Sequence, residues 1–133
     1  MKFTFGYTGL RVRDLDACVR FFTKGLGMKE VERTVIRETG GTIVNLESDG
    51  HEHRLELNWY PPGSRFDDPY VAGEALDHLA FDMHDAKLED AIRHLEKAGG
   101  KVRIAPFMEA GGRIAYVDSP DGHTIELYEP KRG

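Results

Sequence analysis

Cysteine is nearly absent from this sequence, since Cys18 is the one cysteine among 133 residues. An intrachain disulfide is therefore impossible, and a zinc site built from cysteine ligands is excluded. Long apolar runs are also missing, so we expect no segment to cross a membrane. Residues 1–5 lack the apolar stretch and the small-residue cleavage site of a secretory signal. Together these absences predict a cytoplasmic protein.

An excess of basic residues is absent as well. The chain has 18 Lys and Arg residues against 23 Asp and Glu residues, a net charge of −5, and the two signs are interspersed. The positive surface that holds a nucleic-acid backbone is therefore missing. We expect neither a nucleic-acid nor a membrane partner. A length of 133 residues fits a single domain, residues 1–133.

Internal similarity divides the sequence into two halves. Residues 7–29 and residues 78–101 each have the pattern of a strand, a helix and a turn. The helical stretches, 14–24 and 85–97, repeat apolar residues at the spacing of one helix face. Each helix is therefore predicted to pack on a sheet, and Cys18 on the apolar face of the first is predicted to be buried.

The ends of the two predicted helices also match. Asp14 and Asp85 lie 71 positions apart, and each is placed to cap the start of its helix. Gly27 and Gly99 lie 72 positions apart and suit the left-handed position after a helix. Matched spacing of caps and glycines favours a true repeat over a chance resemblance.

Three strand-like stretches follow each helix. They are roughly 29–37, 42–48 and 53–60 in the first half, and 101–107, 113–118 and 123–129 in the second. The sequence therefore predicts an α+β fold made of tandem βαβββ modules, with helices on one face of curved sheets. The modules are expected at about 5–60 and 76–130, joined by an exposed loop at 61–75 that is rich in Pro, Gly and Asp.

Strand alternation places four polar side chains on the face opposite the core. Tyr7 and His78 occupy equivalent places in the first strand of each half, and Glu56 and Glu126 occupy equivalent places in the last strand. Taken singly, each is most simply a solvated residue on the polar face of a strand. Taken as a symmetric set, they could meet on one concave face if a pseudo-twofold axis relates the halves.

One imidazole and two carboxylates suit a divalent ion such as Zn, Ni, Co, Mn or Fe. The set of His78, Glu56 and Glu126 therefore predicts a metal site. It is not the two-histidine, one-carboxylate triad of non-haem iron oxygenases, because Tyr7 stands where a second histidine is needed.

Several segments resemble short bacterial glyoxalase I (lactoylglutathione lyase). In order along the chain, these are residues 10–16, 21–22, 26–28, 55–57, 77–81 and 119–127. The similarity covers nearly the whole chain, and it implies a member of the vicinal-oxygen-chelate superfamily. The implied fold is the glyoxalase/bleomycin-resistance/dioxygenase fold, in which the βαβββ modules form curved, cup-like mixed sheets.

The resemblance implies four metal ligands, which map onto Tyr7, Glu56, His78 and Glu126. The first ligand of the family is normally His, or Gln in eukaryotic relatives, so Tyr7 is a departure. A phenol has an unperturbed pKa of about 10 and ligates a metal only as phenolate. Three interpretations stay open: Tyr7 is a phenolate ligand, it hydrogen-bonds a metal-bound water, or it marks a site that has lost activity.

The resemblance also suggests residues that bind the thiol. Arg11 stands where the family holds a glutathione carboxylate, although a surface ion pair is an equally open interpretation. Asn58 begins an Asn-Trp pair that lies two residues closer to the strand glutamate than in the family. Arg113, within residues 109–113, would replace the lysine of a Lys-Gly-Gly element. The co-substrate is therefore glutathione or another thiol.

The implied reaction isomerises the hemithioacetal of a 2-oxoaldehyde, such as methylglyoxal, and a thiol to a 2-hydroxyacyl thioester. One divalent ion, foremost Zn, Ni or Co, would act as Lewis acid while Glu126, or Glu56, moves the proton. Short family members are homodimers with the site at the subunit interface, so we expect a homodimer. The alternatives are another enzyme of the superfamily (an epimerase, dioxygenase or thiol transferase) or a metal-free binding protein of the bleomycin type.

Overall fold

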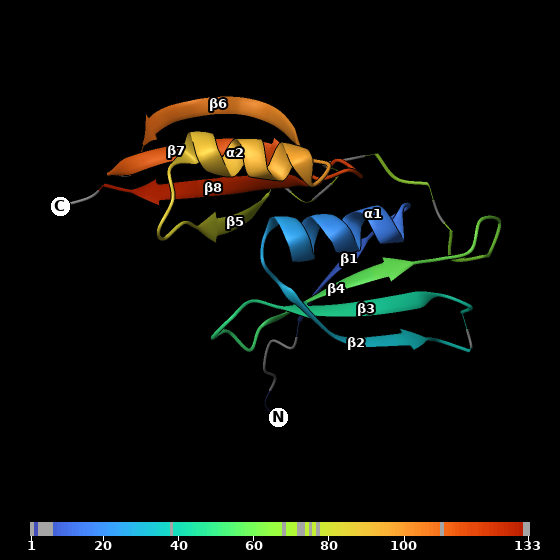
Figure 1. Cartoon of the computed structure of the whole chain (residues 1–133). Coiled ribbons are helices and arrows are strands. Elements are labelled where there is room, and N and C mark those ends of the chain that lie inside the picture. Colours follow the sequence, from blue (N-terminus) through green and yellow to red (C-terminus); the bar gives the residue numbers. More distant parts are fainter. Residues whose placement is uncertain are drawn as a thin grey trace. The chain divides into compact units, whose positions relative to one another are not determined.

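A computed structural model describes residues 2, 7–37, 39–67, 69–71, 74, 76, 78–109 and 111–131. The chain forms two compact units, Met1–Pro69 and Tyr70–Gly133, called unit 1 and unit 2 below. The boundary falls inside the loop predicted at 61–75, of which residues 68, 72, 73 and 75 lie outside the described part of the chain. Each unit contains one four-stranded sheet and one α-helix (Figure 1).

Unit 1 is a strand, a helix and three further strands. Its elements are β1 (Tyr7–Arg11), α1 (Leu15–Arg20), the π-helical turn η1 (Phe21–Gly25), β2 (Lys29–Val35), β3 (Thr42–Glu47) and β4 (Arg54–Trp59). The strands lie in the order β1-β4-β3-β2. β1 runs parallel to β4, and the other neighbours are antiparallel.

Unit 2 repeats this topology. Its elements are β5 (Leu79–Asp82), α2 (Leu88–Lys97), β6 (Lys101–Glu109), β7 (Gly112–Asp118) and β8 (Thr124–Pro130). The order β5-β8-β7-β6, with β5 parallel to β8 and the rest antiparallel, is the same as in unit 1. The predicted α+β fold of tandem βαβββ modules is therefore confirmed.

The core of each unit lies between the helix and one face of the sheet. Buried and partly buried residues alternate along β3 and β8, as the pleat of a strand requires. In β4 and β7, Glu56 and Ile114 are buried as well, on the face opposite the helix. The buried apolar side chains of unit 1 are Leu10, Val12, Cys18, Phe21, Phe22, Met28, Val44, Leu46, Leu55 and Leu57; those of unit 2 are Leu88, Ile92, Leu95, Ile114, Ala115, Val117, Ile125 and Leu127. Cys18 is fully buried, as predicted.

Only one of the two predicted N-caps is correct. Asp14 caps α1, since the Ala17 amide donates to its Oδ1 at 3.0 Å. The prediction that Asp85 caps the second helix is wrong, because α2 begins at Leu88. The Leu88 amide instead donates to Oε2 of Glu129, a residue of β8, at 2.9 Å. A carboxylate from a strand distant in sequence therefore caps α2 in place of a local side chain.

The predicted left-handed glycines are both present. Gly27 follows the π-helical turn with φ of 74°, and Gly99 follows α2 with φ of 101°. A side chain with a Cβ is strained at such angles, so glycine ends each helix and directs the chain into the next strand.

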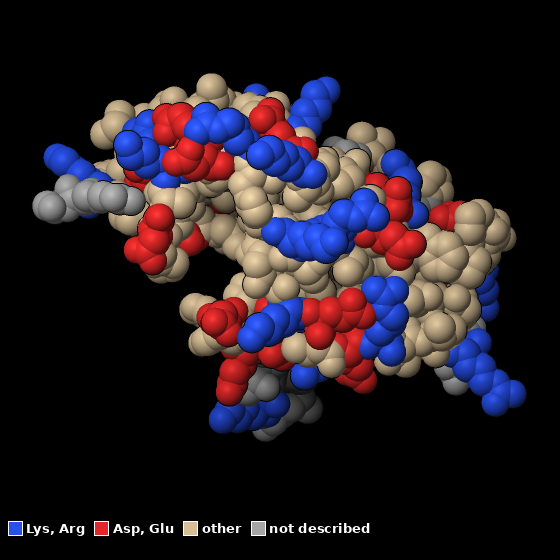
Figure 2. All heavy atoms as spheres, viewed as in Figure 1, with Lys and Arg blue, Asp and Glu red and all other residues tan. Residues whose placement is uncertain are grey.

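Charges of both signs are mixed over the surface. On the face drawn in Figure 2, Lys and Arg side chains lie among Asp and Glu side chains and do not gather into one basic area. Among the described residues, no helix has the length and hydropathy needed to span a membrane.

Candidate functional site

Glu56 lies in the middle of β4, on the face that points away from α1. It pairs with Gly9 of β1 on one side and with Asn45 of β3 on the other. Its exposed fraction is only 9%, and its carboxylate has no hydrogen bond or ion pair within the described residues. A nearly buried carboxylate without a partner is costly, so this position suits a bound cation or a substrate donor.

Tyr7 begins β1 and lies on the same face of the sheet as Glu56. The parallel pairing sets Tyr7 opposite Arg54 and Gly9 opposite Glu56, so Tyr7 is two residues from the partner of the carboxylate. The Tyr7 side chain is 54% exposed, a high value for an aromatic ring. Its phenol is therefore accessible to a ligand, and metal binding by Tyr7 stays a prediction.

His78 and Glu126 meet in unit 2. His78 directly precedes β5, and β5 runs parallel to β8, which carries Glu126 opposite Ala80. His78 Nε2 lies 3.3 Å from Glu126 Oε2, and the side chains are 33% and 21% exposed. Asp77, which precedes His78 in the motif quoted above, lies outside the described residues. Two ligand-type donors of the predicted set are thus brought together by strand pairing.

The two units place their glutamates at equivalent registers. Glu56 pairs with Gly9, two residues after Tyr7, and Glu126 pairs with Ala80, two residues after His78. The equivalence predicted from sequence spacing is therefore present in the strand pairing itself. Each unit presents one Glu on the face opposite its helix, together with Tyr7 at the start of β1 or His78 just before β5.

Sequence reasoning missed Tyr116. This residue of β7 pairs with Glu126 across the sheet, and its hydroxyl donates to Glu126 Oε2 at 2.8 Å. The Tyr116 ring also meets the His78 ring edge-on, with centroids 5.7 Å apart. The repeat could have indicated this residue. Tyr116 of β7 corresponds to Asn45 of β3, and Asn45 pairs with Glu56 of β4.

The predicted thiol-binding residues of unit 1 lie beside Glu56. The Arg11 guanidinium lies over the Tyr60 ring at 4.8 Å from its centroid, and Arg11 pairs with Asn58 across the sheet. The Asn58 amide Nδ2 lies 3.4 Å from the Glu56 carbonyl oxygen. Stacking on an aromatic ring holds a guanidinium in a fixed orientation.

Arg113 has structural partners that its predicted role did not anticipate. It alternates with Tyr116 along β7 and therefore faces α2, on the side of the sheet opposite Glu126. Its guanidinium binds the Glu89 carboxylate of α2 at 2.7 and 3.0 Å and that of Glu129 at 2.7 Å. Substrate binding by Arg113 stays a prediction.

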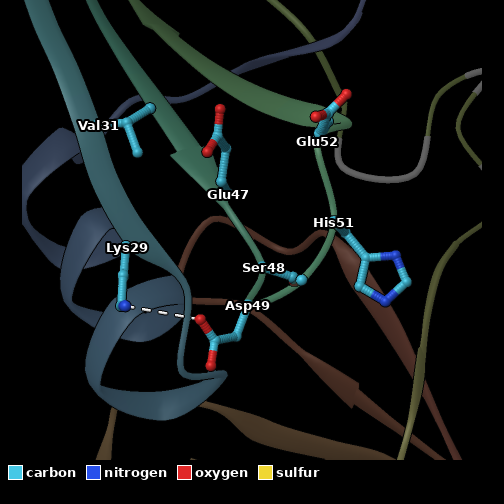
Figure 3. Close-up of a pocket in the computed structure, with 8 residues that line it drawn as sticks. Lys29, Val31, Glu47, Ser48, Asp49, His51 and Glu52 are labelled. Atoms are coloured by element: carbon cyan, nitrogen blue, oxygen red, sulfur yellow. Dashed lines mark ion pairs between the residues drawn. The ribbon is translucent and has the colours of Figure 1, made fainter.

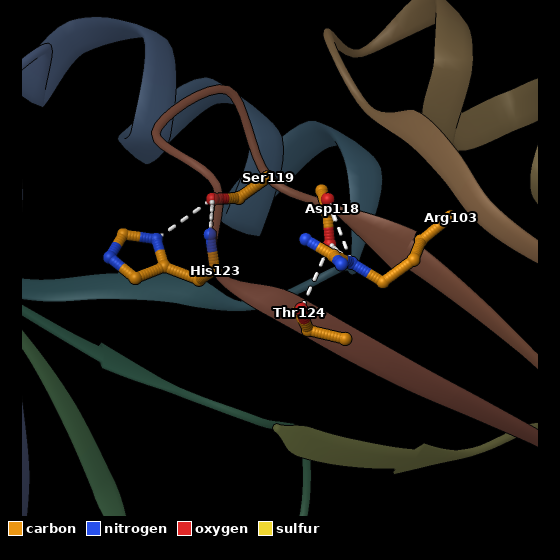
Figure 4. Close-up of polar contacts among 5 residues, drawn as sticks. All are labelled: Arg103, Asp118, Ser119, His123 and Thr124. Carbon is orange, nitrogen blue, oxygen red and sulfur yellow. Dashed lines mark hydrogen bonds and ion pairs between the residues drawn. The ribbon is translucent and has the colours of Figure 1, made fainter. Parts of the chain in front are cut away.

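Two further histidines, His123 and His53, contact hydroxyl groups. His123 is buried, with Nδ1 2.8 Å from the Ser119 hydroxyl, and its amide also binds that hydroxyl (Figure 4). The neighbouring Asp118 binds Arg103 and Thr124, so the turn before β8 is closed by side chains. His53 Nε2 lies 3.1 Å from the Thr8 hydroxyl.

A shallow pocket of about 400 Å³ lies in unit 1 where β3 leads into β4. Its lining comes from β2, β3 and the connecting loop: Lys29, Val31, Glu47, Ser48, Asp49, Gly50, His51 and Glu52 (Figure 3). Lys29 Nζ lies 3.6 Å from Asp49 Oδ1, so the positive charge of Lys29 in this pocket is paired with the Asp49 carboxylate. None of the predicted site residues lines it.

The donors are therefore arranged in pairs. Within either unit, the described residues include no group of three or more His, Cys, Asp or Glu side chains that could hold a metal ion. Unit 2 supplies the His78–Glu126 pair, and unit 1 supplies Glu56 with Tyr7 on the same sheet face.

Comparison with known proteins establishes the family. The model of the glyoxalase/bleomycin resistance protein/dioxygenase superfamily matches residues 4–127. The chain belongs to this superfamily. The family predicted from the sequence motifs is thereby confirmed.

Relatives in the superfamily indicate an enzyme. A probable lactoylglutathione lyase of Vibrio cholerae is 33% identical over 132 residues, covering 95% of this chain and 90% of the relative. The lactoylglutathione lyase of Escherichia coli O157:H7 is 34% identical over 131 residues, covering 94% and 91%. The chain is thus a glyoxalase-like enzyme.

Solved structures from the superfamily share the fold. The trypanothione-dependent glyoxalase I of Leishmania major superposes with a TM-score of 0.71 at 28% identity, covering 92% of this chain and 84% of that one. A glyoxalase/bleomycin resistance protein/dioxygenase domain from Frankia superposes with a TM-score of 0.73 and covers 98% of this chain and 100% of that one. At 23% identity, the Frankia domain shows the fold alone.

Proposed function

We propose that the protein is a metal-dependent isomerase that converts the hemithioacetal of a 2-oxoaldehyde and a thiol into a 2-hydroxyacyl thioester. The observation that carries the proposal is the register equivalence of Glu56 and Glu126, one of which contacts His78. The names of the bacterial relatives, lactoylglutathione lyases, support the choice of reaction.

The side chains fit a divalent metal ion. His78 Nε2 and Glu126 Oε2 lie 3.3 Å apart on partly exposed side chains, and imidazole and carboxylate are ordinary ligands of Zn, Ni and Co. Glu56 is a nearly buried carboxylate without a partner, for which a cation would compensate. We therefore propose Glu56, His78 and Glu126 as ligands, with the exposed phenol of Tyr7 as the fourth.

The chain's own residues would carry the proton. A bound metal ion would supply Lewis-acid polarisation of the two adjacent oxygens of the substrate. Glu126 would remove the proton from one carbon and return it to the next, which changes no oxidation state overall. Its side chain is 21% exposed, so it is both accessible to a substrate and largely shielded from water.

The thiol part of the substrate would bind to unit 1. Arg11 offers a guanidinium already oriented by the Tyr60 ring, and this group suits a carboxylate of glutathione or of another acidic thiol. Asn58, its partner across the sheet, would add an amide donor.

Two measurements test the proposal. Metal analysis of the purified protein, without added ions, should find close to one divalent ion per chain. A spectroscopic assay with methylglyoxal and glutathione should then show thioester formation. No metal after attempted reconstitution would contradict the proposal and favour a metal-free binding protein, an interpretation that the departure at Tyr7 supports. Metal without isomerisation would point to another reaction of the superfamily.

Replacing the proposed base gives a sharper prediction. We expect Glu126→Gln to lower kcat by ~10²–10⁴, because a positioned acid or base contributes about that factor. The thermal midpoint of unfolding should change little, since the side chain is not in the core. The control is Glu96→Gln, which removes the same charge from an exposed position of α2 and should leave kcat unchanged. A Glu126→Gln protein with full activity would remove Glu126 from the mechanism.

We also propose that the protein acts as a homodimer in which each metal ion takes ligands from both copies. The support is the grouping of the donors in pairs, because neither unit supplies four ligands within its described residues. A stable monomer with bound metal, observed by sedimentation, would contradict this proposal.

A further inference from the structure

Glu126 has a second polar neighbour besides His78. Tyr116 of β7 lies directly across the sheet from Glu126, and the Tyr116 hydroxyl donates to Oε2 at 2.8 Å. His78 Nε2 lies 3.3 Å from the same oxygen. The Tyr116 and His78 rings meet edge-on with centroids 5.7 Å apart, so two side chains that contact each other both contact one carboxylate oxygen.

The equivalent carboxylate in unit 1 lacks such a donor. Asn45 holds the place of Tyr116, since it pairs with Glu56 as Tyr116 pairs with Glu126. Within the described residues, however, the Glu56 carboxylate has no hydrogen bond. The repeat thus conserves the position of the two glutamates but gives only Glu126 a hydroxyl donor. This asymmetry indicates different roles for two residues that sequence alone treats as interchangeable.

We propose that Tyr116 is a positioning residue that holds the Glu126 carboxylate in the orientation from which it exchanges a proton with the substrate. The inference rests on the proposed function. A glutamate side chain has several rotatable bonds, and proton transfer requires a heavy-atom approach of ~2.6–3.2 Å. A short hydrogen bond from a ring anchored in the same sheet removes that freedom. Displacements of about 1 Å cost much of the rate in such reactions.

The hydrogen bond from Tyr116 to Glu126 also indicates different roles for Glu56 and Glu126. If Glu126 acted as base after holding a metal ion, the Tyr116 hydroxyl would still donate to one of its oxygens. Within the described residues the Glu56 carboxylate has no such donor, so Glu56 would serve as a metal ligand only. Tyr116 would thereby favour Glu126, rather than Glu56, as the carboxylate that exchanges the proton.

The test is a substitution that removes only the hydroxyl oxygen of Tyr116. We expect Tyr116→Phe to lower kcat about 10-fold with KM within about twofold, because the substitution spares substrate contacts but frees the base. Titration of the metal-free protein with Co²⁺, followed by absorption, should show an affinity about 10-fold weaker, as expected for a metal ligand that has lost its supporting hydrogen bond. The control is Tyr128→Phe, which removes a hydroxyl from the same face of the sheet and should change neither value.

The outcomes separate the two proposals. If the wild-type protein binds Co²⁺ but does not isomerise the hemithioacetal, the proposed reaction fails, while a weakened Co²⁺ affinity in Tyr116→Phe still supports positioning. If Tyr116→Phe matches the wild type in both kcat and Co²⁺ affinity, the positioning role is overturned. A change in KM alone also overturns it, since that result assigns Tyr116 to substrate contact. A wild-type protein without Co²⁺ affinity overturns both proposals.

Discussion

At the scale of single residues, Arg113 of unit 2 binds two carboxylates, those of Glu89 and Glu129. Hydrogen bonds from Arg113 lower the pKa of Glu89 from 4.5 to about 2. The pKa of Glu129 is also lowered, first by the Leu88 amide and then by Arg113. Both shifts mean that the folded protein favours the charged carboxylates, so the contacts stabilise the fold where those groups are ionised.

This network predicts how stability depends on acid. Because the folded pKa of Glu89 lies below its ordinary value, the stabilisation is complete above pH 4.5 and is lost as the pH falls toward about 2. Arg113→Gln should therefore flatten the decrease in the free energy of unfolding across that window, measured by urea unfolding at several pH values. The contact is exposed, so the difference should be small and should shrink in added salt.

Lys97→Gln is the matched control for this experiment, since it removes an exposed cation from the last turn of α2. It should leave the slope against pH as in the wild type. An Arg113→Gln protein with the wild-type slope would show that the network contributes nothing to acid stability.

Sequence alone predicted the faces of the site residues but not their contacts. Strand alternation was enough to place Glu56, His78 and Glu126 opposite the core, because the period of a strand is two whatever its partners. It could not predict that Tyr116 meets Glu126, since that contact depends on the register between β7 and β8. The contact of Arg113 with Glu129 depends on that same register, and its contact with Glu89 depends on how α2 packs on the sheet.

At the scale of elements, the two helices start in different ways. Asp14 caps α1 through the Ala17 amide, three residues along the chain. At α2 the N-cap residue is Lys87, which makes no side-chain cap, and Glu129 of β8 binds the Leu88 amide instead. One helix is therefore capped locally, and the other depends on the sheet that it covers.

Removing the two caps should therefore have separable effects. Asp14→Ala and Glu129→Ala should each lower the free energy of unfolding by about 1 kcal/mol, the ordinary cost of losing an N-cap acceptor. Hydrogen exchange should localise the change, with faster exchange at the start of α1 in the first variant and at Leu88 in the second.

A substitution on the outer surface of α2 serves as control. Glu96→Ala keeps both caps and should change the free energy of unfolding by no more than about 0.5 kcal/mol. If Glu129→Ala leaves exchange at Leu88 unchanged, the distant carboxylate is not the cap of α2.

The elements themselves were largely predictable. Each predicted strand is present within a few residues, because alternation and turn residues are local properties of the sequence. The start of α2 was not predictable. Asp85 has the residue type of a cap, but residues 84–86 form a turn in which the Ala86 amide donates to the His84 carbonyl oxygen. The π-helical turn at Phe21–Gly25 had no sequence signal that we recognised.

At the scale of the whole molecule, the repeat divides the proposed ligands evenly. Unit 1 carries Tyr7 and Glu56, and unit 2 carries His78 and Glu126. If each metal ion takes ligands from both copies of a homodimer, a defect in one unit of one copy can be complemented by the other copy.

A mixing experiment tests this arrangement. Glu56→Gln and Glu126→Gln proteins should each be almost inactive, yet their mixture, unfolded and refolded together, should recover about one quarter of wild-type activity. This follows because half of the dimers are then hybrids, and each hybrid has one site built only from unmodified residues. Activity is measured with methylglyoxal and glutathione.

A second mixture is the control. His78→Ala and Glu126→Gln alter the same unit, so every site of their hybrid lacks one of the two residues and no activity should return. If the first mixture also stays inactive although hybrid dimers form, each metal site is built within one chain.

The distant cap of α2 also has a consequence while the chain is being synthesised. The acceptor for the Leu88 amide lies 41 residues further along the chain, whereas the acceptor for the Ala17 amide lies only three residues back. The first helix can therefore be capped as soon as it leaves the ribosome. The second must wait, with its first turn open, until nearly all of its own sheet has been made. The two halves share a fold, but their nascent chains become competent to form it at different moments.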